Sequence, residues 1–156
     1  MTRADLIAAL EKAEGPSRGL DAEIAFDLFA KPVGKSPVDG GPIGYIWPED
    51  DPSWSLARRF PGKDRAWFTA VRKRIGGETL VIERDGALVL MNAQRVKHYT
   101  ASLDAALPWE KIVTMVYYKG GYECQQINAF SSPGWHKLEA IARRIAALKA
   151  REAGDG

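Results

Sequence analysis

The stretch that decides the fold is His98-Tyr99-Thr100-Ala101-Ser102-Leu103-Asp104-Ala105-Ala106-Leu107. It begins with an extended pair of residues, and either Thr100 or Ser102 is placed to cap a short helical turn that follows. Asp104 lies near the start of this turn, where a carboxylate suits the helix dipole, and Pro108 ends the turn. The chain before the stretch is rich in loops, whereas two strand-like runs and one long helix come after it.

The bulk composition is that of one soluble domain. The chain has 156 residues, of which 46% are hydrophobic and 27% are charged, with a formal net charge of +2. We expect a single α+β domain over residues 1–152 and a frayed tail at 153–156. The charge is too small to indicate nucleic acid by itself. The single cysteine, Cys124, excludes an intrachain disulfide and favours a reducing cytoplasm, and no apolar run is long enough to imply a membrane partner.

Two helices are expected before residue 30. Thr2 and Asp5 have the spacing of a capping box, and Gly15-Pro16 ends the first helix. Ser17 is placed to cap the second helix. Its buried stripe is expected at positions 20, 24 and 28, with Asp21 facing away from that stripe.

The segment of residues 31–97 differs in composition from the rest. Prolines and glycines interrupt any regular element over 31–52, and a loop of this length is usually functional or mobile. Its aromatic residues, Tyr45 and Trp47 among them, either pack against the domain or contact a partner. Residues 54–75 are basic and aromatic, with a helix expected over 66–75 and Gly76 as its stop. The arginines and lysines there either interact favourably with the dipole at the C-terminal end of a helix or form an anion-binding surface with stacking aromatics.

Two hairpins are expected. Residues 78–92 form nearly continuous apolar arms around the turn dipeptide Asp85-Gly86, so both faces of this hairpin should be covered. Residues 109–118 and 122–130 form the second hairpin across Lys119-Gly120-Gly121. Gln126 and Asn128 share one face of its second arm, where they either satisfy backbone groups or line a pocket.

The last helix is expected to begin near Trp135, after a loop at residues 131–134. Its buried stripe includes Ile141, Ile145 and Leu148, with Arg144 outside the stripe or at its border. The four expected strands predict a small, mainly antiparallel sheet of two hairpins layered between helices. This is an α/β/α sandwich within the α+β class, with a long Pro/Gly-rich insertion.

Three parts of the chain together resemble the phage ABA sandwich domain family. They are residues 6–25 with Gly15-Pro16-Ser17-Arg18-Gly19-Leu20-Asp21, residues 99–107 quoted above, and the Ala-rich end at 138–152. The family pattern has Gly-Pro-x-Arg-x-Leu-Asp in a leading helix pair, then Thr-x-Ser-x-Asp-Ala-Ala, a hairpin and a final Ala-rich helix. Residues 31–97 do not follow this pattern and resemble an expanded insertion. The resemblance implies a small phage or prophage protein with an α/β/α layered fold, and it implies no established activity or catalytic residues.

Most catalytic chemistry finds no support in the sequence. Neither His98 nor His136 has a partner at metal-ligand spacing, and the phosphate-loop, nucleophile-elbow and zinc-protease motifs are absent. Cys124 has no activating base near it in sequence and reads as a buried, inert thiol. We therefore expect no enzyme activity, no catalytic residue, no metal and no cofactor.

The first hypothesis is a non-enzymatic phage protein of the bacterial cytoplasm that either sequesters a nucleotide-derived small molecule, as a counter-defence protein would, or blocks a host protein. A homo-oligomer fits this hypothesis, because small ligands are often held between subunits. The alternatives are a structural or interaction module of a phage complex and a nucleic-acid-binding protein, the latter disfavoured by the modest charge. Aromatic stacking and bidentate arginine contacts suggest the ligand site. The candidate ligand-binding residues are Trp47, Trp54, Arg58, Arg59, Trp67, Tyr99, Ser102, Asp104, Gln126 and Asn128.

Overall fold

The computed structural model describes residues 2–35, 37, 40–42, 44–46, 55–58, 69–70, 72–73, 75–84, 87–117 and 119–155. The chain divides into two compact units. Unit 1 comprises Met1–Asp21 and His98–Gly156, and unit 2 comprises Ala22–Lys97. Helices and antiparallel sheets occupy separate parts of the chain, which confirms the predicted α+β class. The described residues contain eight strands in three sheets, more than the four strands expected.

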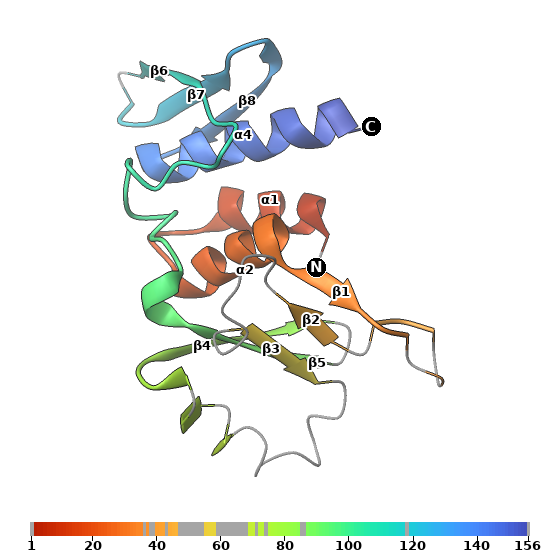
Figure 1. Ribbon diagram of the computed structural model, residues 1–156. Coiled ribbons are helices and arrows are strands. Elements are labelled where there is room, and N and C mark those ends of the chain that lie inside the picture. The colour runs from red at the N-terminus through yellow and green to blue at the C-terminus, as the bar shows by residue number, and fades with distance from the viewer. Residues whose placement is uncertain are drawn as a thin grey trace. The chain divides into compact units, whose positions relative to one another are not determined.

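Unit 1 is built on one three-stranded sheet and two long helices. The helices are α1 (Arg3–Lys12) and α4 (Glu139–Asp155), and the sheet has the antiparallel order β6-β7-β8. The strands are β6 (Ile112–Val116), β7 (Tyr122–Gln126) and β8 (Ala129–His136). Helix α4 packs beneath the sheet, chiefly under β8 and β7, and α1 lies against the opposite side of α4 (Figure 1). The middle layer of unit 1 is therefore α4.

The predicted capping box of α1 is confirmed, and both of its hydrogen bonds are present. The Thr2 Oγ1 accepts the Asp5 N–H at 3.1 Å, and the Asp5 carboxylate accepts the Thr2 N–H at 2.9 Å. This hydrogen bond from the Thr2 backbone holds the pKa of Asp5 below its ordinary value. The apolar face that follows, with Leu6, Ile7 and Leu10, is buried.

Helix α2 (Arg18–Phe29) begins at the predicted cap, since the Ser17 Oγ accepts the Leu20 N–H at 3.2 Å. The expected outward position of Asp21 is wrong, because this residue is fully buried. Its carboxylate accepts the Thr100 N–H and Oγ1–H, both at 2.8 Å, and forms an ion pair with Arg18 at 2.9 Å. A buried carboxylate is tolerated here because its oxygens find donors.

The organising stretch 98–107 forms turns, so the predicted helical turn is wrong. Thr100 is not a helix cap, because its Oγ1 accepts the Ser17 N–H at 2.8 Å. The expected position of Arg144, outside the α4 stripe or at its border, is also wrong, since the residue is fully buried. Its guanidinium donates to the carbonyl oxygens of Tyr99 (3.1 Å), Ser102 (2.5 Å) and Leu103 (3.1 Å), and thereby fixes the stretch.

The second hairpin is confirmed for β6 and β7, but the segment after it differs from the prediction. Strand β7 ends at Gln126, a turn at Ile127 and Asn128 follows, and residues 129–136 form β8 instead of a loop. Helix α4 consequently begins later than expected, at Glu139. The reason lies at Gly134, where a Cβ would come within 2.3 Å of the Ala142 carbonyl oxygen. The glycine therefore marks a close approach of strand to helix rather than a loop.

Unit 2 contains two antiparallel sheets and most of α2. One sheet pairs β1 (Lys31–Val33) with β2 (Gly44–Ile46), and the other has the order β3-β5-β4. Its strands are β3 (Ser55–Arg58), β4 (Thr79–Arg84) and β5 (Ala87–Asn92), followed by the short helix η3 (Ala93–Arg95). The hairpin of β4 and β5 is confirmed, with its Asp85-Gly86 turn outside the described residues. The expected cover on both faces is wrong for β4, because the Val81 side chain is 41% exposed.

The Pro/Gly-rich segment is more regular than expected, since β1 and β2 lie within it. Of its aromatic residues, Tyr45 is buried and packs edge-to-face against Phe26 with 4.8 Å between ring centroids, as the packing interpretation predicts. Arg84 lies over the same Phe26 ring at 4.6 Å and forms an ion pair with Glu23. The predicted helix stop is confirmed by Gly76, which adopts a φ of 63° after helical Arg72, Lys73 and Ile75.

Candidate functional site

The most unusual surface of unit 1 is the side of the β6-β7-β8 sheet that faces away from α4. Four apolar side chains there are exposed: Val113 (46%), Met115 (45%), Phe130 (55%) and Trp135 (52%). We call these four residues the outer face. A soluble protein rarely leaves several large apolar side chains exposed on one side of a sheet unless another molecule covers them.

Strand alternation explains why these residues point outward. Cys124 is buried against α4, and it pairs with Thr114 in β6 and Gly134 in β8. Their neighbours Val113, Met115 and Trp135 therefore lie on the other face. Phe130 follows Ala129, which pairs with the buried Gln126, and so also points outward.

A polar row crosses the outer face along β7. Glu123 pairs with Met115 and Trp135, and its carboxylate accepts a hydrogen bond from the Gln125 amide at 3.4 Å. The hydrogen bond between Tyr117 and Glu123 is the main cause that raises the pKa of the Tyr117 phenol. The outer face therefore combines apolar flanks with one carboxylate, a pattern that suits a partner with an apolar surface and a basic side chain.

The Trp135 ring packs closely against a glycine. Gly121 is buried, and a Cβ on it would lie 2.7 Å from Cζ2 and 3.1 Å from Cε2 of Trp135. The ring therefore lies directly against the turn between β6 and β7, while half of the residue stays exposed. An indole that is positioned in advance loses little entropy when a partner covers it.

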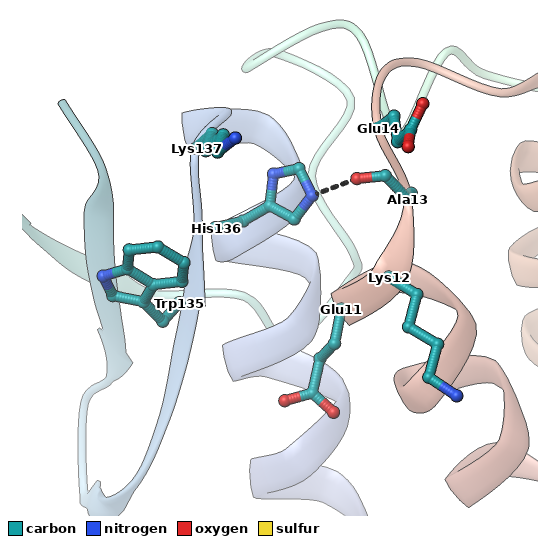
Figure 2. Close-up of a pocket in the computed structure, with 7 residues that line it drawn as sticks. All are labelled: Glu11, Lys12, Ala13, Glu14, Trp135, His136 and Lys137. Carbon is teal, nitrogen blue, oxygen red and sulfur yellow. Dashed lines mark hydrogen bonds between the residues drawn. The ribbon is translucent and has the colours of Figure 1, made fainter.

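A pocket of about 460 Å³ lies beside β8, between the end of α1 and His136 (Figure 2). The Leu138 N–H donates to the Nδ1 of His136 at 2.9 Å, which leaves Nε2 to carry the hydrogen and donate to the Ala13 carbonyl oxygen at 2.6 Å. Both ring nitrogens are thus engaged, because Nε2 joins β8 to the end of α1 and Nδ1 holds the backbone just before α4. The arrangement makes His136 a structural tie rather than a catalytic base.

The wall of this pocket is charged. Glu11, Lys12, Glu14 and Lys137 line it, and Trp135 projects from β8 on the side opposite His136 (Figure 2). A second pocket of about 250 Å³ lies between the organising stretch and the start of α4, with Thr100, Leu103 and Leu138 in its lining. Neither pocket is lined by any of the ten predicted ligand-binding residues.

Three of those predicted residues lie on the organising stretch. Tyr99 is buried, and burial raises the pKa of its phenol to about 12. The Ser102 Oγ accepts the Asp104 N–H at 3.2 Å in a local turn, and the Asp104 side chain is exposed. The three residues serve the local structure of the stretch and do not converge on either pocket.

Gln126 and Asn128 do not share a face. The Gln126 amide donates to the Trp109 carbonyl oxygen at 2.8 Å and accepts the Lys111 N–H at 3.0 Å. This is the backbone-satisfying role that the sequence left open. Asn128 lies in the turn after β7 with a φ of 72°, a conformation that asparagine tolerates better than most residues.

The other five predicted residues belong to unit 2. Arg58 lies in β3, where it pairs with Leu88 of β5. Trp47, Trp54, Arg59 and Trp67 lie outside the residues that the structure describes.

None of the four residues of the outer face was a predicted site residue. Alternation over Ile112–Val116 was visible, but it cannot show which side of a strand a helix will cover. Phe130 was expected at the end of the 122–130 arm but its side of the sheet was not identified, and for Trp135 the signal was hidden because Pro133 and Gly134 suggested a loop.

The described part of the chain has neither a membrane-spanning helix nor a metal-binding cluster. None of its helices is long and apolar enough to cross a membrane. Its His, Cys, Asp and Glu side chains form no group of three that could hold a metal ion.

Comparisons with protein-family models, with curated proteins and with solved structures find no match for this chain. The resemblance to the phage ABA sandwich domain family therefore stays a prediction from the sequence.

Proposed function

We propose that this protein is a non-enzymatic binding protein that attaches to another protein through the outer face of the β6-β7-β8 sheet. The observation that carries the proposal is the exposure of Val113, Met115, Phe130 and Trp135 on one side of a sheet whose other side is packed on α4. Trp135 is the expected anchor, because tryptophan is enriched among the residues that dominate binding energy.

The sequence resemblance to a phage family favours a bacterial host protein as the partner and the bacterial cytoplasm as the setting. Blocking a host protein requires a rigid, complementary surface and no catalytic group. A partner surface with apolar side chains around a lysine or arginine would match the outer face, because the basic group would meet Glu123.

Site-specific photocrosslinking in the bacterial host tests this proposal. A benzophenone amino acid in place of Phe130 should form a covalent adduct with one host protein, whereas the same amino acid in place of Val81 should not. Val81 is a matched control because its side chain is similarly exposed but lies on β4 in unit 2. Adding Trp135→Ala should reduce the adduct at position 130 about tenfold or more.

The proposal fails if position 130 gives no protein adduct other than a crosslinked second copy of the chain, or if positions 130 and 81 give the same adducts. Circular dichroism of each purified variant distinguishes a loss of crosslinking caused by misfolding from a loss of binding.

Sequestration of a nucleotide-derived molecule is a separate hypothesis from the sequence. It depends chiefly on the aromatic and arginine residues of unit 2, of which the structure describes Arg58, in β3. Native mass spectrometry of the protein purified from its host tests it, since a retained small molecule would add its mass to the intact chain.

A further inference from the structure

Strand β6 has an unpaired edge whose hydrogen-bonding groups can be assigned residue by residue. The Ile127 N–H donates to the Lys111 carbonyl oxygen and the Tyr117 N–H donates to the Gly121 carbonyl oxygen, both at 2.9 Å. In an antiparallel ladder, the residues that bond to one neighbour alternate with those that bond away from it. The N–H and C=O groups of Ile112, Thr114 and Val116 therefore point to the edge opposite β7.

No strand among the described residues pairs with that edge, because the sheet order is β6-β7-β8. The strand itself, Ile-Val-Thr-Met-Val, has no charge and no proline. Natural proteins usually protect an exposed sheet edge with a charged residue, a proline or a bulge. The other edge of the sheet is protected in this way, since β8 carries Pro133 and has a register irregularity against β7. The difference indicates that β6 is an edge kept open for pairing.

We propose that a second copy of this chain pairs with β6, antiparallel and around a two-fold axis at Thr114. This arrangement sets Thr114 against Thr114 and Ile112 against Val116 as hydrogen-bonded pairs, so each edge-facing donor meets an acceptor. It also sets Val113 against Met115 on the outer face. A two-fold arrangement closes on itself, as in most homodimers, and β6 then has no unpaired edge.

The side chains of β6 support this register. Val116 is 71% exposed although it lies on the α4 side of the sheet, because α4 packs mainly under β8 and β7. In the dimer the Ile112 side chain of the second copy becomes its direct cross-strand neighbour, and such aliphatic pairs stabilise a sheet.

The charges at the ends of β6 also complement one another. The two-fold axis places Lys111 of one copy opposite Tyr117 of the other. Tyr117 is hydrogen-bonded to Glu123, so the Lys111 ammonium approaches a carboxylate at each end of the paired strands. Complementary charge at both ends favours a second copy over an unrelated strand. This inference rests on the edge of β6 and is independent of the proposed docking of a host protein on the outer face.

The test is the oligomeric state of four purified proteins, measured by sedimentation velocity over a concentration series. The unchanged protein should be a dimer. Val113→Lys with Met115→Lys brings like charges together across the axis and should raise the dissociation constant by about 100-fold or more. Val113→Glu with Met115→Lys places Glu opposite Lys and should restore the dimer. Only the proposed register predicts this reversal.

Val81→Lys is the matched control, since it adds a charge to an equally exposed strand position in unit 2 and should leave the dimer intact. The inference is overturned if the unchanged protein is a monomer at about 100 μM, a concentration at which even weak specific pairing is populated. It is equally overturned if the Lys/Lys variant dimerises as well as the Glu/Lys variant. If the Lys/Lys variant does not fold, Val113→Glu with Met115→Glu takes its place, because it also brings like charges together across the axis. Photocrosslinking at position 130 to a host protein can succeed or fail regardless of this result.

Discussion

The Oγ1 of Thr100 lies 2.8 Å from the carboxylate of Asp21, although 79 positions separate the two residues in the chain. The Thr100 N–H donates to the same carboxylate oxygen, also at 2.8 Å. Both residues are almost completely inaccessible to solvent. This contact joins the first turn of α2 to the organising stretch.

Removing the threonine hydroxyl should destabilise the protein. In Thr100→Val the Ser17 N–H loses its acceptor and the Asp21 carboxylate loses a donor. We expect the free energy of unfolding to fall by about 2 kcal/mol in urea titrations. Ser102→Ala is the control in the same stretch, because the Ser102 Oγ makes only a local turn contact with Asp104, and it should cost less than about 0.5 kcal/mol. Equal decreases in the free energy of unfolding of the two variants would show that the buried contact makes no specific contribution to stability.

Two glycine substitutions should change the stability of the protein in opposite directions. In Gly134→Ala the new Cβ would come within 2.3 Å of the Ala142 carbonyl oxygen and 2.5 Å of the Ala146 nitrogen, so strand and helix must separate. We expect a loss of about 3 kcal/mol. Gly19→Ala places its Cβ in ordinary contact with the Ser17 Oγ at 3.6 Å within α2, and should stabilise the protein by about 0.5 kcal/mol. Thermal unfolding measures both changes, and a stable Gly134→Ala variant would contradict the close packing of β8 on α4.

Arg144 should be among the most sensitive positions in unit 1. Arg144→Met leaves the carbonyl oxygens of Tyr99, Ser102 and Leu103 without their donor and removes the partner of the Glu110 carboxylate, which lies at 2.6 Å. We expect a loss of about 3 to 5 kcal/mol. Arg143→Met provides the control on the same helix, since Arg143 pairs with Glu139 in a partly exposed position and its loss should cost about 1 kcal/mol. Comparable unfolding midpoints for the two variants would refute this assignment.

The same variant should change how stability depends on pH. Burial is the main cause that raises the pKa of Glu110, and the Arg144 charge opposes this effect. A carboxyl group whose pKa is raised in the native state adds stability below its unfolded pKa and loses that stability as pH rises through the native pKa. Without Arg144 the pKa of Glu110 should rise further. The stability of Arg144→Met should therefore fall more steeply than that of the unchanged protein between about pH 4 and pH 7. Urea titrations at several pH values measure the two slopes, and parallel curves would contradict the prediction.

Cys124 should react slowly with thiol reagents while the protein is folded. The thiol is fully buried, and burial raises its pKa, so the reactive thiolate is scarce and inaccessible. We expect little labelling by a disulfide reagent at about pH 8 and complete labelling of this single cysteine in guanidinium. Stoichiometric labelling of the folded protein within seconds would contradict the burial of β7 against α4.

Local sequence signals predicted much of the fold. The capping box of Thr2 and Asp5, the Ser17 cap and the Gly76 stop each act within one helical turn, so the residues that specify the structure are adjacent in the chain. The β4-β5 hairpin and the pairing of β6 with β7 were predictable for the same reason. Local patterns also predicted the burial of Cys124 and the α+β class.

The candidate site could not be predicted in the same way. The ten ligand residues were chosen from residue type, but Tyr99, Ser102 and Gln126 are engaged in local or backbone contacts that type does not reveal. The outer face depends on which side of the sheet α4 covers, and alternation along a strand leaves both choices open.

The sequence by itself determined where α1 and α2 begin and that β4 with β5 and β6 with β7 form hairpins, because those features follow from contacts between near neighbours. Only the tertiary structure decided the roles of Asp21, Arg144 and Gly134. Asp21 and Arg144 look like surface positions on an isolated helix, yet each is buried because distant backbone groups of the 98–107 stretch need a charged partner. Gly134 resembles a loop residue until α4 is placed within 2.3 Å of the Cβ that it lacks. Such requirements arise between segments far apart in the chain, so no local pattern records them.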